Sequence, residues 1–332
     1  MTTASRSALR RLAAKRMPLI LLLLVIAASL LTEGRFLQVD NLINVMRQVS
    51  LEGLIAFGMT LVIVTGGIDL SVGSLVAFTG VLAALAMKAL PEAAPGLRIA
   101  AGFVCGIGVG AVVGAVGGAI IGRFSIPPFI VTLATMLVAR GFAFIFCDGQ
   151  PVYELPEELK WWGRGFVLES VIGRVLPTPV LVMLAGYVFF LVLFTRTVFG
   201  RSVVAVGSNE QAAFLAGIPV RTTKVVVYLL TGLLCGLAGV LHDAKLMAGD
   251  PKVGEMWELN VIAAVVVGGT SLFGGRGTIT GTLIGALIIG VLNNGLNLLH
   301  VEHFWQKVVL GLVILAASLL DAGLRRLEAR SF

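Results

Sequence analysis

One acid stands alone in a long apolar stretch of the sequence. Asp69 is the only acidic residue between Glu52 and Glu92. A carboxylate inside a bilayer is costly, and it usually pairs with another group or marks an ion or solute pathway. At a helix start, the same side chain can instead accept a hydrogen bond from a backbone N–H group and cap the helix. The local sequence leaves both interpretations open.

The residues around Asp69 are predicted to interrupt a helix. Gly66 and Gly67 would end the preceding apolar run. Asp69 or Ser71 would cap the next helix, and Gly73 would let another backbone approach. Because non-helical backbone in a bilayer needs protein or a watery cavity around it, these five residues are candidates for a hinge or a pathway. A tight turn with a helix cap is the structural alternative.

The sequence offers no pattern for enzyme chemistry. It lacks the G-x-x-x-x-G-K-[ST] loop that binds phosphates, so we expect no ATPase site in this chain. The cysteines and histidines lie apart, without metal-ligand spacing, at positions 105, 147, 235, 242, 300 and 303. We therefore expect no catalytic residue, no metal site and no cofactor bound by this chain.

The composition indicates an integral membrane protein. The 332 residues are 58% hydrophobic and 13% charged, whereas soluble domains carry about 25% charged residues. At about 20 residues per span the apolar runs allow about ten transmembrane helices in an all-α, single polytopic domain over residues 1–332. The expected spans are 17–31, 47–66, 70–90, 99–122, 127–147, 178–195, 225–247, 258–269, 279–298 and 304–322.

The charges predict the topology. The basic tail 1–16, the loop 197–224 and the basic C-terminus belong in the cytoplasm, because positive loops stay inside. The loop 148–177, with its acids and a tryptophan pair, belongs outside. Both termini are then inside, which requires an even number of spans. The net charge of +7 reflects these topology signals, so we do not expect nucleic-acid binding.

Glycines recur every fourth residue from Gly102 to Gly122. This spacing places them on one helical stripe, which lets helix backbones touch in lipid. A formal G-x-G-x-x-A match at 106–111 lacks the strand and the acid of a dinucleotide site. We interpret the stripe as a packing surface. Arg140, in the next span, is expected to extend toward the membrane interface.

A second glycine-broken hairpin begins at Gly268 and Gly269. The spacing Gly-Gly-x-x-Leu is shared with Gly66 and Gly67, and broken helices in both halves are typical of transporters. Asn293 and Asn297 lie one turn apart on one face of the next span. Such amides either line a solute pathway or hold helices together.

The loop 197–224 contains a short polar helix, which is predicted over 209–216. Ser208 or Asn209 can cap it, and Gly217 ends it. The helix is too short and too polar to span a membrane. It is either a docking element or an idle loop, and the pattern favours docking.

Three segments resemble the permease subunits of ribose-type bacterial ABC sugar importers, a family that includes permeases for ribose, xylose, arabinose, galactose and autoinducers. They are GIDLSVGSL at 67–75, GSNEQAAFLAGI at 207–218, and the run from Val261 to Leu299 with AVVVGGTSLFGGRG and LNNGLNLL. The resemblance covers nearly the whole chain.

The resemblance implies a permease in the bacterial inner membrane that imports a ribose-like monosaccharide. It implies three partners: a cytoplasmic ATPase subunit with two nucleotide-binding halves that uses ATP, a periplasmic sugar-binding protein, and a second permease chain, alike or unlike. It also implies that 207–218 is a coupling loop that touches the ATPase through Asn209, Glu210, Ala213 and Gly217. An ion-coupled transporter with Asp69 as its ion site is the alternative. Within the leading interpretation, Asp69 caps a helix.

Overall fold

The computed structural model describes residues 3–167, 169, 173 and 175–329. Apart from two isolated β-bridges, the elements in these ranges are helices. In chain order they are α1 Thr3–Leu31, η1 Arg35–Leu37, α2 Val39–Val64, α3 Val72–Lys88, α4 Pro95–Phe124, α5 Pro128–Phe146, η2 Glu157–Leu159, α6 Lys160–Arg164, α8 Thr178–Arg196, α9 Val198–Ser208, α10 Glu210–Leu215, α11 Val220–Leu246, α12 Trp257–Val267, α13 Ile279–Leu298 and α14 His303–Ala329.

Each of the ten predicted spans falls on one of these helices. Six helices are long and apolar enough to cross a membrane, namely α2, α4, α5, α8, α11 and α13. The other four spans coincide with shorter apolar stretches, which are Met17–Leu31 of α1, α3, α12 and Phe304–Leu319 of α14. The prediction of an all-α polytopic membrane protein is confirmed. Helix α1 begins at Thr3, so the basic segment is helical from that residue onward.

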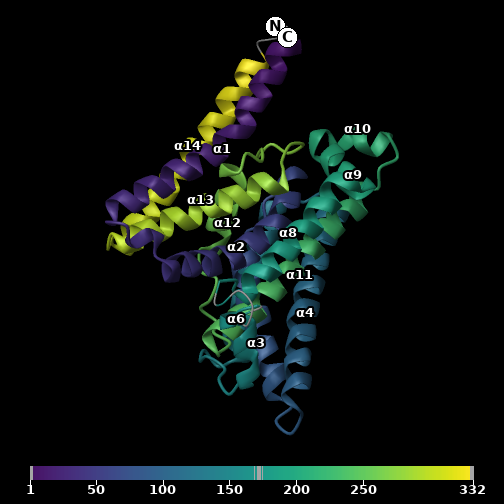
Figure 1. Ribbon diagram of the computed structural model, residues 1–332. Coiled ribbons are helices and arrows are strands. Elements are labelled where there is room, and N and C mark those ends of the chain that lie inside the picture. The colour runs from purple at the N-terminus through teal and green to yellow at the C-terminus, as the bar shows by residue number, and fades with distance from the viewer. Residues whose placement is uncertain (1–2, 168, 170–172, 174, 330–332) are drawn as a thin grey trace.

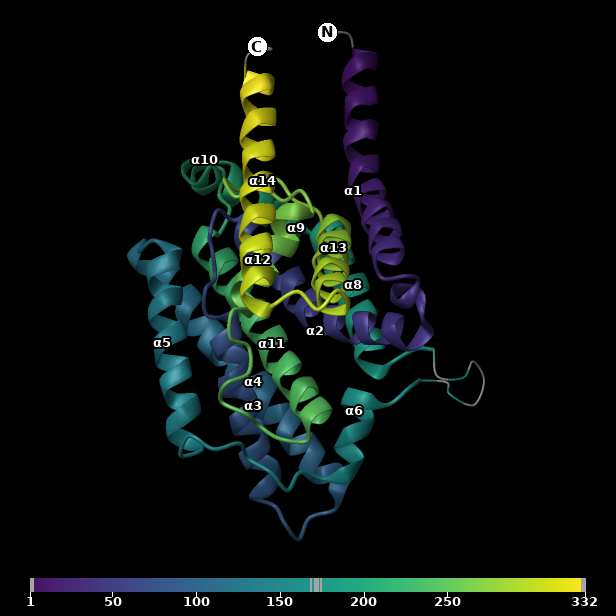
Figure 2. The same ribbon diagram turned by 90° about the vertical axis from the view of Figure 1, so that its left-hand side faces the viewer.

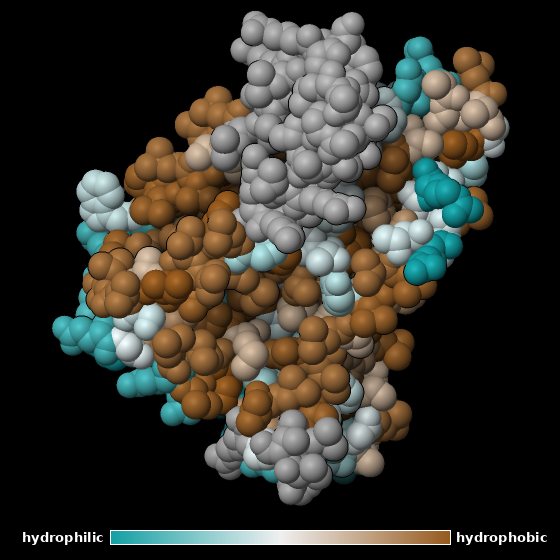
Figure 3. All heavy atoms as spheres, turned by 45° about the horizontal axis from the view of Figure 1, so that its top comes forward, coloured by the Kyte–Doolittle hydropathy of each residue, from teal (hydrophilic) through white to brown (hydrophobic). Residues whose placement is uncertain are grey.

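Helix α2 forms the centre of the bundle, and 83% of its most apolar stretch is buried. Helix α4 lies at the periphery, with only 17% of its stretch buried, so most of its apolar side chains face outward. The space-filling view shows apolar side chains over much of the surface (Figure 3). This outward apolar surface suits contact with lipid tails.

The glycine stripe of α4 packs against α11, as predicted. An added Cβ at Gly110 would lie 2.2 Å from the carbonyl oxygen of Gly232, and one at Gly114 would lie 2.2 Å from that of Tyr228. The two backbones therefore touch at these positions, and a side chain of any size would separate them.

Gly110→Ala is expected to destabilise the protein by about 1–3 kcal/mol, because the new methyl group forces α4 away from α11. Gly108→Ala is the matched control, since a Cβ there would have no described atom within 4 Å. The thermal stability of the detergent-solubilised proteins measures the difference. Equal stability of the two variants would show that the stripe is not a tight interface.

The two ends of the bundle carry different elements (Figures 1 and 2). Helix α10 lies at the same end as the start of α1 and the end of α14. Helix α6 and the turn between α3 and α4 lie at the opposite end. The predicted inside segments thus share one end, and the predicted outside loop lies at the other.

The segment 148–177 is folded onto the bundle at that opposite end. Leu159 is fully buried, Trp162 contacts Phe103 edge-on, and Gly163 packs against the backbone of Lys245. The tryptophan pair lies on the short helix α6. Residues 168, 170–172 and 174 of the predicted loop lie outside the described residues.

Arg140 is tied to the loop between two predicted spans, and its course toward the membrane interface stays a prediction. Its guanidinium donates hydrogen bonds to the carbonyl oxygens of Pro251 (2.6 Å) and Val253 (2.8 Å), so it fastens the segment between α11 and α12 to α5. The backbone of that segment leaves carbonyl groups to be satisfied within the protein, and the buried charge finds its partners there.

Candidate functional site

The first glycine-broken hairpin connects α2 to α3. Gly66 adopts a φ of +82°, which a residue with a side chain rarely takes. Gly67 faces Tyr228, whose hydroxyl would lie 2.4 Å from an added Cβ. Helix α2 therefore ends where the sequence predicts.

Asp69 is buried at the start of α3, and only 5% of the residue is exposed. Its Oδ1 atom accepts hydrogen bonds from the backbone N–H (2.9 Å) and from the hydroxyl (2.6 Å) of Ser71. The N-cap residue of α3 is Ser71, and no side chain caps the helix, so Asp69 does not form the cap that the sequence suggested; its carboxylate instead holds the turn before Ser71. Thr132 of α5 donates to the carbonyl of Ile68 at 3.1 Å and holds the hairpin from the other side.

Gly73 lies where a second chain segment passes. An added Cβ would be 2.1 Å from the carbonyl oxygen of Gly254, in the segment that precedes α12. The close backbone approach predicted for Gly73 is therefore present.

The second glycine-broken hairpin connects α12 to α13. Gly268 packs against Gly281, because a Cβ added to Gly268 would lie 2.4 Å from the carbonyl oxygen of Gly281. Gly269 adopts a φ of +89°. Thr278 caps α13 by accepting a hydrogen bond from the N–H of Gly281 at 3.0 Å.

The two hairpins meet each other and the end of α9. The N–H of Gly275 donates to the carbonyl of Val64 at 2.8 Å. An added Cβ at Gly207 would lie 1.7 Å from that carbonyl oxygen, and one at Gly274 would lie 3.1 Å from the nitrogen of Gly66. We call Gly66, Gly207, Gly274 and Gly275 the glycine junction. The junction joins the end of α2 and the second hairpin to the end of α9. Gly207, in α9, lies two positions before Asn209, the cap of α10.

Helix α10 has defined ends, as predicted. Asn209 caps it by accepting a hydrogen bond from the N–H of Ala212 at 2.9 Å. At the other end Gly217 has a φ of +80° and donates to the carbonyl of Phe214, while Ile218 donates to that of Ala213. These two bonds form a Schellman motif, which needs the left-handed conformation that glycine supplies.

Some side chains of α10 hold the helix to the rest of the protein, and others are exposed. Glu210 is half-exposed, and both its oxygens accept from Lys224 at 2.8 Å, which ties α10 to α11. Ala213 is buried against Val206 and Val220, so in this structure it anchors α10 and does not face outward. The outward positions are taken by Phe214 and Leu215, which are 70% and 84% exposed.

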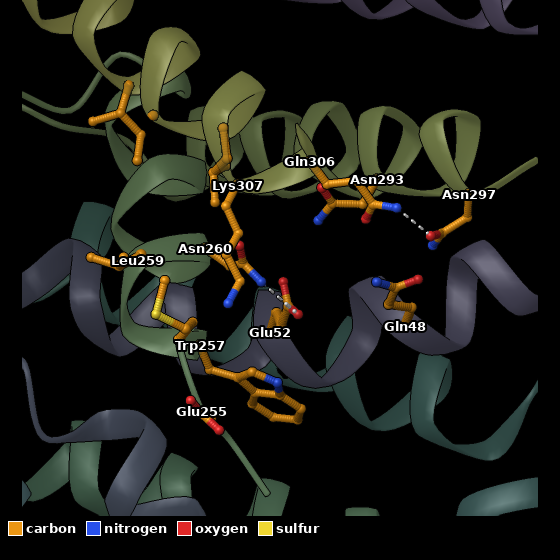
Figure 4. Close-up of a pocket in the computed structure, with 14 residues that line it drawn as sticks. Gln48, Glu52, Glu255, Trp257, Leu259, Asn260, Asn293, Asn297, Gln306 and Lys307 are labelled. Atoms are coloured by element: carbon orange, nitrogen blue, oxygen red, sulfur yellow. Dashed lines mark hydrogen bonds between the residues drawn. The ribbon is translucent and has the colours of Figure 1, made fainter. Parts of the chain in front are cut away.

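A polar cavity of about 420 Å³ lies between α2, α12, α13 and α14 (Figure 4). Asn293 and Asn297 both line it, together with Gln48 and Glu52 of α2. The lining also includes Glu255, Met256, Trp257, Leu259, Asn260, Gln306, Lys307, Leu310, Gly311 and Ile314. Asn297 also accepts a hydrogen bond from Gln306 of α14 at 2.8 Å, so it joins two helices as well as lining the cavity. The neighbouring Asn294 exchanges two 2.9 Å hydrogen bonds with Asn41.

Comparison with known proteins decides the family. A family described as "Branched-chain amino acid transport system / permease component" matches residues 41–318. The chain is 48% identical to the ribose import permease protein RbsC of Bacillus subtilis, over 91% of this chain and 90% of that protein. It is 43% identical to RbsC of Escherichia coli K12, over 91% and 92%. This chain belongs to the ribose-type ABC sugar permease family.

The permease also resembles relatives named for other sugars. It is 40% identical to the L-arabinose ABC transporter permease protein AraH of Azospirillum brasilense, over 92% of this chain and 87% of that protein. No solved structure matches the permease. Family membership and the apolar helices make it a multi-pass protein of the bacterial inner membrane and the transport component of a sugar ABC importer. The ion-coupled alternative is not favoured.

Proposed function

We propose that this permease moves a ribose-like monosaccharide across the inner membrane and is driven by a separate ATPase subunit. The similarity to ribose import permeases over nearly the whole chain carries this proposal. The relatives named for ribose and for L-arabinose support a monosaccharide as the substrate, and the two RbsC relatives support ribose.

The ATPase subunit is expected to bind at the end of the bundle that carries α10. Phe214 and Leu215 offer it an apolar surface beside the exposed Asn209 and Glu210. Exposed apolar side chains on a short, well-capped helix are typical of a docking site. We place this end, with both termini, in the cytoplasm, because its loops carry the basic residues.

The opposite end then faces the periplasm and the sugar-binding protein. The folded segment around α6 lies there and presents Tyr153 and Trp161, which are exposed. A second permease chain, alike or unlike, completes the transporter, and ATP is used by the ATPase subunit alone.

Uptake into proteoliposomes tests the proposal. The permease, its ATPase subunit and the sugar-binding protein are reconstituted together, and accumulation of radiolabelled ribose is measured with and without ATP. We expect ATP-dependent accumulation of ribose. Accumulation of branched-chain amino acids, and none of any monosaccharide, would contradict the proposed substrate class.

A further inference from the structure

We propose that the polar cavity between α2, α12, α13 and α14 is a transient binding site for one uncharged monosaccharide. This inference rests on the proposed importer function and names the place in the permease where the sugar pauses. The cavity volume of about 420 Å³ falls within the range of small-molecule pockets, which is about 300–1,000 Å³.

The lining matches the chemistry of sugar hydroxyl groups. Each hydroxyl both donates and accepts hydrogen bonds, and an amide side chain does both as well. Gln48 and Asn293 point into the cavity from facing helices (Figure 4), and the described part of the chain leaves their side-chain amides free. The indole of Trp257 adds an apolar surface for the carbon face of a sugar ring.

The hydrogen bond between Asn260 and Glu52 can be replaced by hydrogen bonds from these two side chains to a sugar. The Nδ2 atom of Asn260 donates to Oε1 of Glu52 at 3.3 Å, just beyond the usual range of about 2.7–3.2 Å for a protein hydrogen bond. A sugar hydroxyl placed between them would donate to the carboxylate and accept from the amide. One long hydrogen bond between Asn260 and Glu52 is thus replaced by two hydrogen bonds to the sugar. The long bond re-forms when the sugar leaves.

The charges of the cavity favour an uncharged ligand. Glu52 and Glu255 oppose the single cation Lys307 among the lining residues. The lining therefore gives no positive excess, so a phosphorylated or acidic sugar would find no net positive charge to hold it.

The helices that line the cavity also reach the glycine junction. Glu52 precedes Val64 by twelve residues, so the cavity lies about 18 Å along α2 from the junction. Asn260 is on α12, which ends at the second hairpin. A movement of α10 that separates the two hairpins would therefore change the distance between Glu52 and Asn260, and would release the sugar.

Cysteine labelling of the reconstituted complex tests the site. Gln48→Cys and Asn293→Cys place thiols on two sides of the cavity, and the rate of reaction with a water-soluble thiosulfonate reagent is measured with and without saturating ribose, in the presence of the binding protein and ATP. Gln38→Cys is the control outside the cavity, and the unchanged chain gives the background from its own cysteines.

We expect ribose to slow the labelling of the two cavity positions several-fold, leucine to have no effect, and Gln38→Cys to react at one rate throughout. Equal labelling rates with and without ribose at both cavity positions would overturn the inference. If one variant fails to insert into the membrane, the labelling rate at the other position decides. Ribose uptake by the unchanged chain, reconstituted with the same partners, separates the two proposals. Normal uptake without protection contradicts only the cavity site, whereas absent uptake contradicts the importer function.

Discussion

Replacing both Phe214 and Leu215 with serine is expected to prevent the ATPase subunit from binding and to abolish ATP-driven uptake. The two side chains are 70% and 84% exposed, so the permease does not need them for its own packing. Burial of one such side chain in an interface contributes about 1.5–3 kcal/mol. Loss of both removes about 3–6 kcal/mol, which corresponds to roughly 10²–10⁴-fold weaker association.

Co-purification of the ATPase subunit with the tagged permease measures this effect. Tyr153→Ser is the matched control, because Tyr153 is also exposed, at 60%, but lies in the folded segment at the opposite end. Its association with the ATPase subunit should equal that of the unchanged permease. Wild-type association of the Phe214→Ser, Leu215→Ser double variant would show that the ATPase binds elsewhere.

Gly207→Ala is expected to reduce ribose uptake to near background. The new Cβ would lie 1.7 Å from the carbonyl oxygen of Val64, and real Cβ atoms essentially never come within 3.0 Å, so α9 must move away from α2 by more than an ångström. That movement also breaks the approach of Gly275 to Val64 and displaces the cap of α10. The force applied at α10 then no longer reaches the two hairpins.

Three measurements separate a folding defect from a transmission defect in this variant. Protein in the membrane and association with the ATPase subunit should persist, while ribose moved per ATP hydrolysed should fall. Gly141→Ala is the control, since a Cβ at Gly141 would have no described atom within 4 Å. Uptake at the wild-type rate by Gly207→Ala would mean that the glycine junction transmits nothing.

Much of the fold follows from local sequence patterns. Six of the ten spans could be predicted because their apolar helices are long enough to cross a bilayer. The stripe of glycines in α4 and the caps of α10 could be predicted because each depends on spacing along a single helix. The breaks at Gly66 and Gly269 were predictable for the same reason.

The arrangement of the candidate site depended on contacts between distant segments. Gly207, Val64 and Gly275 come together from three parts of the chain, and none of their local patterns indicates the others. The hydrogen bonds of Arg140 could not be predicted, because its partners are backbone carbonyls more than a hundred residues away.

The orientation of α10 also depended on contacts outside the helix. Ala213 turns inward because Val206 and Val220, on the helices before and after α10, close over it. The exposed apolar pair Phe214 and Leu215 on so short a helix was the available signal for the outward face. For the cavity, the signal was the unusual polarity of Gln48 and Glu52 at the start of an otherwise apolar span.

The central claim is that this permease provides the pathway and that a separate ATPase, acting on α10, provides the energy. It is tested most directly by measuring ribose accumulation in proteoliposomes that contain the permease and the binding protein, with and without the ATPase subunit. We predict that ribose is concentrated only when both the ATPase subunit and ATP are present. Concentration of ribose by vesicles that lack the ATPase subunit, driven by a sodium or proton gradient, would contradict the claim.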